Sequence, residues 1–374
     1  MKTRALLSAL VGAAALLLVG AQPALAGHHG GSGSVVFVQT NELGGNRVAV
    51  FNQGSDGRLT QAGSYPTRGL GGAALPGTES DHLASQGSLA YDRSNGLLYA
   101  VNAGSDTLTV FAVQGDRLLR RQVIGSGGSF PVSIAMHGNL LYVLNARNGG
   151  SVQGYLRVGQ HLLPVPSWHR PLGLDPTLTP EFTTTPGQVA FTPDGRKLVV
   201  TTKGNGSDID VFAVNRFGGL SSQPVVNPDP GQVPFAVSFD TGGHLVVAEA
   251  ANAVATFTIN ADGTLALVDR EPTGQSATCW IVRNGSSFYA SNAGSASLSG
   301  YSDDGSGALT ALGNATTDAG TVDATVSSDG RYLYVQTGAN GIVDAFRIGT
   351  GGSLTQIGAV TVPGAAGGEG IVAG

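Results

Sequence analysis

The chain has 374 residues, of which 58 are glycine and 17 are proline, while 41% are hydrophobic and only 12% are charged. This composition excludes a disordered polyelectrolyte, a long helical bundle and, because glycine shows no three-residue period, collagen. We therefore expect an all-β protein. Because the formal net charge is −5 and no run of five basic residues occurs, we expect that it binds no nucleic acid.

The beginning of the chain has the pattern of a secretory signal peptide. Lys2 and Arg4 precede a nearly unbroken apolar run that ends at Gly20, and Ala24-Leu25-Ala26 supplies the small residues that a signal peptidase requires. The apolar run is short for a membrane span of about 20 residues, so cleavage is favoured over a retained anchor.

Cleavage after Ala26 divides the chain into three parts. We predict a signal peptide at residues 1–26, a flexible Gly/Ser/His leader at 27–33, and one folded domain at 34–374. The mature protein is expected to be secreted, either outside the cell or into the periplasm, with no membrane attachment after cleavage. We expect it to be a monomer.

Two sequence anchors recur along the domain. One is a short strand that ends in a polar residue, at Thr40, Asn102, Asn145, Thr202, Glu249, Asn292 and Thr337. The other is a turn followed by leucine, at Leu59, Leu118, Leu162, Leu220, Leu265, Leu309 and Leu354. Strand-forming units that repeat about every 45 residues are typical of β-propeller blades, each a four-stranded antiparallel sheet. Seven anchors of each kind predict seven blades.

One blade is especially clear in the sequence. Its four strands are predicted at 233–239, 244–249, 253–259 and 264–271, and Ala261-Asp262-Gly263 is a hairpin turn between the last two.

The two ends of the domain supply complementary parts of a blade. The chain enters at residues 34–39 with a second strand, while residues 369–373 resemble a first strand that no second strand follows. We therefore expect the C-terminal strand to complete blade one and close the ring, which leaves no unpaired sheet edge at the junction. An eight-bladed ring and an open β-solenoid are the alternatives.

Unequal spacing between anchors locates two insertions, at residues 63–84 and 164–186. Both connect the last strand of one blade to the first strand of the next. Such connections emerge on the same face as the turns that follow the second strands. Because loops on a rigid scaffold commonly carry function, this face around the channel mouth is the candidate site.

Several residues on this face could take part in chemistry. Glu249 is the only ionisable residue among the first anchors, and a carboxylate there could act as a general base, with His82 and His169 as further catalytic candidates. The candidates for binding a substrate are Arg147, Arg170, Lys203, Asn102, Asn145, Asn292, Gln188 and Asp323. No metal site and no cofactor are expected.

Each candidate also has a purely structural interpretation. Asparagine and threonine at strand ends commonly satisfy turn hydrogen bonds, and Glu249 could do the same. His82, His169 and Arg170 could be ordinary polar loop residues. Cys279 is interpreted as a small buried thiol, since the sequence around it supplies no base to activate it.

The strands and turns resemble a known family. YAVNAGSDTLTVFAV, YVLNA, YASNAGSASLSGY, FTPDGRKLVV and DGRYLYV are similar to segments of the β-propeller lactonases, which include 6-phosphogluconolactonases and 3-carboxymuconate cyclases. SQGSLAYD, PGQVAFTPDG, VVAEA and ATCW resemble a secreted bacterial branch. The resemblance implies a seven-bladed fold and metal-free opening or closing of a lactone. These are blade-building motifs, so no catalytic residue is carried over from the family.

Two functions therefore stand as hypotheses. In the first, a lactonase-like enzyme acts on a small lactone or sugar acid, with Glu249 activating water and Arg147, Lys203 or Arg170 holding a carboxylate. In the second, a non-catalytic extracellular propeller binds a ligand, protein or glycan through the same face.

Overall fold

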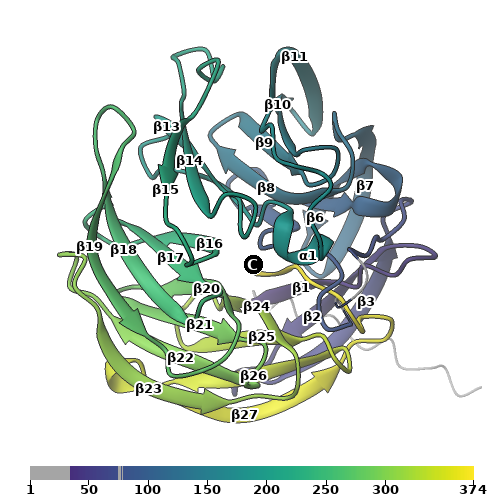
Figure 1. Ribbon diagram of the computed structural model, residues 1–374. Helices are drawn as coiled ribbons and strands as arrows, with labels where there is room; N and C mark the ends of the chain where they lie inside the picture. Colours follow the sequence, from purple (N-terminus) through teal and green to yellow (C-terminus); the bar gives the residue numbers. More distant parts are fainter. Residues whose placement is uncertain (1–33, 75–76, 78) are drawn as a thin grey trace, which may run out of the picture. The chain divides into compact units, whose positions relative to one another are not determined.

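A computed structural model describes residues 34–74, 77 and 79–374, and the predicted signal peptide and leader lie outside the described residues. The described chain forms seven four-stranded antiparallel sheets, arranged as blades around a common axis (Figure 1). The predicted seven-bladed β-propeller is therefore confirmed. No helix in this described part is long and apolar enough to cross a membrane.

The blades follow one another in chain order, and the strands of each blade run in order from the innermost to the outermost. Blade 1 comprises β28 (Ile371–Ala373), β1 (Val35–Gln39), β2 (Arg47–Gln53) and β3 (Leu59–Pro66). Blade 2 comprises β4 (Leu89–Asp92), β5 (Leu97–Asn102), β6 (Thr107–Gln114) and β7 (Arg117–Gly125). Blade 3 comprises β8 (Pro131–His137), β9 (Leu140–Asn145), β10 (Ser151–Val158) and β11 (His161–Pro171).

The remaining blades have the same order. Blade 4 comprises β12 (Val189–Phe191), β13 (Lys197–Thr201), β14 (Asp208–Ala213) and β15 (Val225–Pro228). Blade 5 comprises β16 (Pro234–Phe239), β17 (Leu245–Glu249), β18 (Ala253–Ile259) and β19 (Leu265–Pro272). Blade 6 comprises β20 (Thr278–Asn284), β21 (Ser287–Asn292), β22 (Ser297–Ser302) and β23 (Thr310–Thr316). Blade 7 comprises β24 (Thr321–Val326), β25 (Tyr332–Thr337), β26 (Ile342–Ile348) and β27 (Leu354–Thr361).

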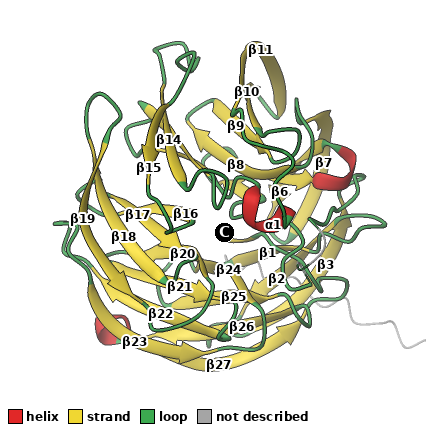
Figure 2. Cartoon of the chain, in the orientation of Figure 1, coloured by secondary structure: helices red, strands yellow, loops and turns green. Residues whose placement is uncertain are grey.

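Among the described residues, helical structure is limited to short segments between strands (Figure 2). They are the α-helix α1 (Glu181–Thr184) and the 3₁₀ turns η1 (Ala103–Ser105) and η2 (Thr350–Gly352).

Blade 5 forms as its sequence pattern predicts. The turn between β18 and β19 depends on Gly263, whose φ of +96° is accessible to glycine without a steric penalty. Asp262 reinforces the turn, because its Oδ1 accepts hydrogen bonds from both the backbone N–H of Thr264 at 3.0 Å and the hydroxyl of Thr264 at 2.7 Å.

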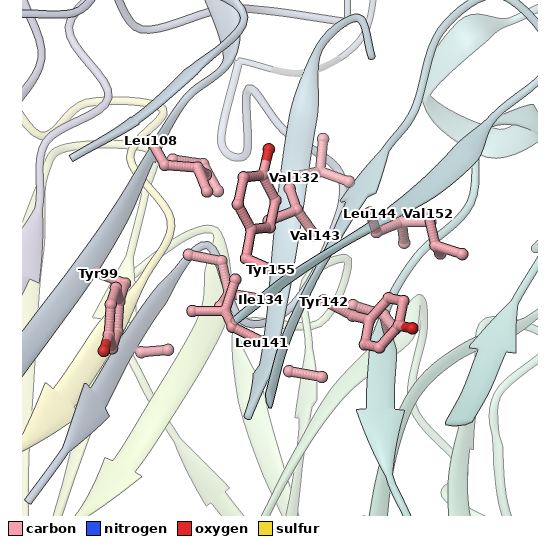
Figure 3. Close-up of a cluster of buried hydrophobic side chains, with 14 of the residues drawn as sticks. Tyr99, Leu108, Val132, Ile134, Leu141, Tyr142, Val143, Leu144, Val152 and Tyr155 are labelled. Atoms are coloured by element: carbon pink, nitrogen blue, oxygen red, sulfur yellow. The ribbon is translucent and has the colours of Figure 1, made fainter. Parts of the chain in front are cut away.

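The core consists of apolar layers between neighbouring blades. Figure 3 shows one such layer, in which Tyr99, Tyr142 and Tyr155 lie among aliphatic side chains of blades 2 and 3. All three rings are almost completely buried. Burial of a large side chain contributes roughly 1.5–3 kcal/mol, so these inter-blade layers supply much of the stability.

Tyrosine hydroxyls also join adjacent blades. Each donates to a glycine carbonyl in the next blade's outer hairpin turn: Tyr142 to Gly218 at 2.7 Å, Tyr289 to Gly352 at 2.9 Å and Tyr334 to Gly57 at 2.8 Å. A Cβ at Gly57 would lie 2.2 Å from the Tyr332 ring, so only glycine permits this approach. Part of the glycine content therefore serves blade packing as well as turns.

The C-terminal strand closes the ring. β28 pairs with β1 through Val36↔Ala373, Phe37↔Val372 and Val38↔Ile371. The backbone N–H of Gly374 then donates to the carbonyl of Val35 at 2.6 Å. Blade 1 is thus built from both ends of the domain, as predicted.

The two inserted loops begin later than predicted. β3 continues to Pro66 and β11 to Pro171, so residues 63–66 and 164–171 are strand residues and not loop residues. In blade 3 the extension follows from packing, because Trp168 stacks on Tyr142 with ring centroids 6.1 Å apart. We call residues 67–88 the first insertion loop and residues 172–188 the second insertion loop.

We predict that deleting residues 371–374 lowers the melting temperature by on the order of 10 °C, because the deletion removes β28 and exposes the edge of β1. Scanning calorimetry measures the change. Ile371→Val, which keeps the strand and removes one methyl group, is the matched control and should lower the melting temperature far less. An unchanged melting temperature in the deletion variant would contradict closure by β28.

Candidate functional site

The two insertion loops and two cationic side chains lie on the same face of the ring. Arg147 follows the second strand of blade 3, and its Nη2 donates to the carbonyl of Ala73 in the first insertion loop at 3.1 Å. Lys203 follows the second strand of blade 4, and its Nζ donates to the carbonyl of Ala84 in the same loop at 2.6 Å. The turns that follow β9 and β13 therefore both contact the first insertion loop.

A cavity of about 170 Å³ lies beside the second insertion loop. It is lined by Ala146, Arg147, Asn148, Gly149, Leu174, Asp175, Pro176, Leu178, Thr179, Glu181, Thr184, Thr185 and Asn205. The lining therefore combines the turn after β9, the segment around α1 and the turn after β13. Figure 2 shows α1 near the middle of the ring.

Arg147 and Glu181 form a bidentate ion pair in this cavity. The guanidinium Nε and Nη2 lie 2.5 and 3.0 Å from the two carboxylate oxygens, and the side chains are 39% and 28% exposed. The guanidinium carbon also lies 4.0 Å from the centre of the Phe130 ring. Both charges are thus held in place while remaining accessible to solvent.

Lys203 lies beneath the cavity and is completely buried. Its Nζ donates to the carbonyls of Ala84 and Phe182, both at 2.6 Å, and contacts the Thr185 hydroxyl at 3.1 Å. Burial lowers the pKa of Lys203 to about 7, although the Asp81 carboxylate opposes this effect. Thr185 connects the ammonium group to the cavity because it also lines the cavity.

Three buried carboxyl groups lie near one another close to the axis. Burial raises the pKa of Asp81 and of Asp323 to about 7 each, and it raises the pKa of Glu369 well above its ordinary value. The charge of Asp81 raises the pKa of the other two further. The Ser85 hydroxyl oxygen lies 2.9 Å from Oε2 of Glu369. Burial therefore opposes the ionisation of all three groups.

The end of the first insertion loop extends across the ring. The Trp280 indole N–H of blade 6 donates to the carbonyl of Ser85 at 2.6 Å, and the Ser85 hydroxyl donates to the carbonyl of Val132 in blade 3 at 3.0 Å. Gln86 continues this pattern, since its side chain exchanges two hydrogen bonds with the backbone of Ile281. The loop thus contacts blades on opposite sides of the axis.

Glu249 lies in a different environment from these groups. Both of its carboxylate oxygens accept hydrogen bonds from Arg270 at 2.8 Å, and its side chain is completely buried. Arg270 belongs to β19, the outermost strand of blade 5, and also contacts Asp229 at 2.6 Å. Burial raises the pKa of Glu249 to about 8, while the guanidinium opposes the shift. The cation facing Glu249 is therefore Arg270, and not Arg147, Lys203 or Arg170.

The predicted asparagines are buried at strand ends, where each donates hydrogen bonds to nearby turns or strands. The Asn102 amide donates to the hydroxyls of Thr107 and Thr109 at 3.1 and 3.0 Å. The amides of the other two donate to neighbouring oxygens: Asn145 to the Ser126 carbonyl and Asn292 to the Ser297 and Ser299 hydroxyls. These contacts match the structural interpretation of the anchor positions.

The other predicted residues are dispersed. His169 is exposed on β11, and Arg170 beside it donates to the backbone carbonyls of Ser221 and Leu220 at 2.7 Å, which joins blade 3 to blade 4. Oε1 of Gln188 accepts from the backbone N–H of Val237 at 2.6 Å.

His82 is half-buried in the first insertion loop, where burial lowers its pKa. Its backbone N–H donates to the carbonyl of Gly367 at 2.9 Å. The His82 ring also lies against Gly367 of the C-terminal segment.

The structure thus brings Arg147 and Lys203 to one site and places Glu249, His169 and Arg170 elsewhere. Glu181 and Thr185 join this site from the second insertion loop. The sequence predicted this insertion but indicated no role for these two residues. Cys279 is a buried free thiol, and burial raises its pKa to about 12. Within residues 34–74, 77 and 79–374, no three His, Cys, Asp or Glu side chains form a group that could hold a metal ion.

We predict that Asp323→Asn reduces the pH dependence of stability. The folded protein holds the Asp323 proton with a pKa near 7, whereas the ordinary value is 3.8, so the wild-type free energy of unfolding falls as pH rises from about 4 to about 7. Replacing the carboxyl group should remove on the order of 2–4 kcal/mol of this fall. Urea unfolding from pH 4.5 to 8 measures it, with exposed Asp304→Asn as the control. Parallel wild-type and Asp323→Asn profiles would contradict this assignment.

Comparison with known proteins agrees with the seven-bladed fold. Residues 172–282 match the sequence model of the family described as "Lactonase, 7-bladed beta-propeller". No curated protein matches the chain. A solved putative 6-phosphogluconolactonase from Bacteroides fragilis is 20% identical, with a TM-score of 0.71, over 92% of this chain and 98% of that chain. The periplasmic gluconolactonase of Pseudomonas aeruginosa is 18% identical, with a TM-score of 0.71, over 90% and 98%. The chain therefore resembles the seven-bladed β-propeller lactonases, as its sequence predicted.

Proposed function

We propose that this protein hydrolyses the lactone of a small sugar acid in the cavity beside Arg147 and Glu181. The observation that carries the proposal is the partly exposed Arg147–Glu181 pair in a cavity of about 170 Å³. The family resemblance supports a lactone as the substrate class, because solved neighbours include a gluconolactonase and a putative 6-phosphogluconolactonase. The cavity is of a size suited to a single sugar ring.

Hydrolysis needs a base, a group that stabilises the developing oxyanion and a proton for the departing oxygen. Glu181 accepts a proton from water as the water oxygen bonds to the lactone carbonyl carbon. Arg147 stabilises the negative charge on the carbonyl oxygen. The ring C–O bond then breaks, and Glu181 returns the proton to the departing alkoxide, which leaves a hydroxy acid. No metal or cofactor is needed for this balance.

The surroundings of Arg147 allow its pairing with Glu181 to change without losing its position. The Phe130 ring and the carbonyl of Ala73 hold the guanidinium independently of Glu181. A substrate oxygen can therefore replace one carboxylate contact, and the freed carboxylate oxygen can face water. Side chains of Asn148, Asp175 and Thr184 supply hydrogen-bonding groups for sugar hydroxyls in the same cavity.

The geometry favours Glu181 over Glu249 as the base. Glu249 is fully buried, and Arg270 occupies both of its oxygens. A base has to reach water beside the substrate carbonyl, and Glu181 meets this requirement because it lines the cavity. We propose that Glu249 instead stabilises blade 5 by joining its second and outermost strands.

We predict that Glu181→Gln lowers kcat for a susceptible lactone by about 100-fold or more, because it removes the general base. Arg147→Met should lower kcat/KM by a similar factor through the lost charge contact. A panel of γ- and δ-lactones of sugar acids, followed by acid release, measures these effects. Glu249→Gln should retain wild-type kcat in its folded fraction, and Glu271→Gln on β19 serves as the surface control.

Two results would contradict this proposal in different ways. Equal turnover by wild type and Glu181→Gln would remove Glu181 from the mechanism. Absence of turnover on every lactone, together with saturable binding of a sugar acid, would favour the non-catalytic binding propeller. Calorimetric titration with gluconate, using Arg147→Met as the comparison, measures that binding.

We further propose that the protein acts outside the cytoplasm as a monomer. The proposed export rests on Lys2, Arg4 and the Ala24-Leu25-Ala26 site. Expression of the full chain in a bacterial host should release a protein whose N-terminal sequence begins at Gly27. Ala26→Tyr should block this processing, because a large side chain does not fit the peptidase site. An intact N-terminus on the wild-type protein would contradict export by cleavage.

A further inference from the structure

Lys203 is a buried cation that the proposed reaction does not use. Its side chain is completely buried, and its Nζ contacts two different loops. One contact is the carbonyl of Ala84, near the end of the first insertion loop, and two are the carbonyl of Phe182 and the hydroxyl of Thr185, in the second. These three contacts join loops that are about 100 residues apart in sequence.

The turn that carries Lys203 also holds the second insertion loop through its backbone. The N–H of Gly204 donates to the carbonyl of Thr183 at 2.8 Å. The Asn205 amide donates to the carbonyls of Asp175 and Thr184 at 2.9 and 3.0 Å. Residues 203–205 thus bind the part of the second insertion loop that lines the cavity.

The backbone at Lys203 has an unusual conformation for a lysine. Its φ is +54°, in the left-handed region that favours glycine or asparagine and that is unfavourable for a lysine. The backbone N–H donates to the carbonyl of Pro234 in blade 5 at 3.2 Å, which helps to hold this conformation. The conformation directs the side chain beneath the two loops.

Burying an ammonium group is unfavourable unless other groups compensate. Three hydrogen-bond acceptors surround Nζ, and the Phe235 ring centre lies 5.1 Å away. The carboxyl groups of Asp81, Glu181 and Glu369 add favourable electrostatic interactions. Asp81 comes from the first loop and Glu181 from the second. The carboxyl groups around Nζ, like its hydrogen-bond acceptors, therefore come from both loops.

We propose that Lys203 is a positioning residue that couples the two insertion loops, so that Thr185 and Glu181 keep their places at the cavity only while the end of the first loop is docked. The coupling itself stands on the contacts of Nζ. Its consequence for turnover rests on the lactonase function proposed above. The site thereby behaves as one unit built from two separate insertions.

Amide hydrogen exchange tests the coupling without any substrate. In Lys203→Met, which keeps the chain length and removes the charge, amides in both 81–86 and 181–185 should exchange at least tenfold faster than in wild type. In Thr185→Val, which removes one contact of Nζ with the second loop, both segments should exchange faster by a smaller factor, because coupling between two sites is reciprocal. Lys197→Met on the same blade is the matched control and should leave both segments at wild-type rates.

Kinetics provide a readout that a merely structural role would not change. With any lactone that the wild type hydrolyses, Lys203→Met should raise KM about tenfold and also lower kcat, because loosened loops weaken substrate binding and displace Glu181, the proposed base. A structural loss of active protein would instead lower apparent kcat with KM unchanged, and that result would contradict positioning.

The outcomes separate the two proposals. Wild-type exchange in both segments of Lys203→Met would overturn the coupling even if the protein is a lactonase. Faster exchange in both segments would support the coupling even if no lactone is hydrolysed. If Lys203→Met does not fold, Thr185→Val decides: faster exchange in both segments supports the coupling, and unchanged exchange or an effect confined to 181–185 overturns it.

Discussion

The pairing of β28 with β1 is the constraint on which the rest of the structure depends. Three residue pairs between these strands convert a series of seven sheets into a ring. Only in a closed ring does each sheet have an apolar neighbour on both faces. Figure 3 shows apolar side chains that blades 2 and 3 contribute to one such cluster. Closure also brings Glu369, which lies two residues before β28, next to Ser85 and Ser88 of the first insertion loop. The end of the chain thus helps to build the face that carries the candidate site.

On that face, buried ionisable groups hold the loops in place, whereas apolar packing holds the blades together. Lys203 and the carboxyl groups of Asp81 and Glu369 are all buried, and such groups are unfavourable unless they interact with one another. Their interactions hold the ends of the two loops against the scaffold. Arg147 and Glu181 differ in being partly exposed, so they combine a fixed geometry with access to solvent. This difference separates the groups that build the site from the groups that can act in it.

The fold could be predicted from the sequence because its signals are local and repeated. The strand ending at Asn102 and that ending at Asn145 each carry the same pattern, and the strand bounds in blade 5 agree with the prediction to within one or two residues. The later start of the insertion loops could not be predicted, because the stacking of Trp168 on Tyr142 depends on tertiary packing.

The candidate site was only partly predictable for the same reason. Arg147 and Lys203 were found because they follow second strands, whose ends the repeat identifies. The partner of Glu249 could not be identified, since Arg270 approaches it from another strand of the same blade. The importance of Glu181 was equally hidden, because it depends on how the second insertion loop folds back toward Arg147. The repeat therefore predicts at which strand ends side chains lie, but it does not predict which charged side chains form ion pairs.

Recognition of the substrate by Arg147 is the step on which the proposed function depends most. Nitrogen-15 NMR of the arginine Nε–H groups, recorded during titration with gluconate, tests it most directly. We expect a saturable shift of the Arg147 signal, assigned through Arg147→Met, with the Arg270 signal unchanged. An unchanged Arg147 signal at saturating ligand, or a shift at Arg270 instead, would contradict this role of Arg147.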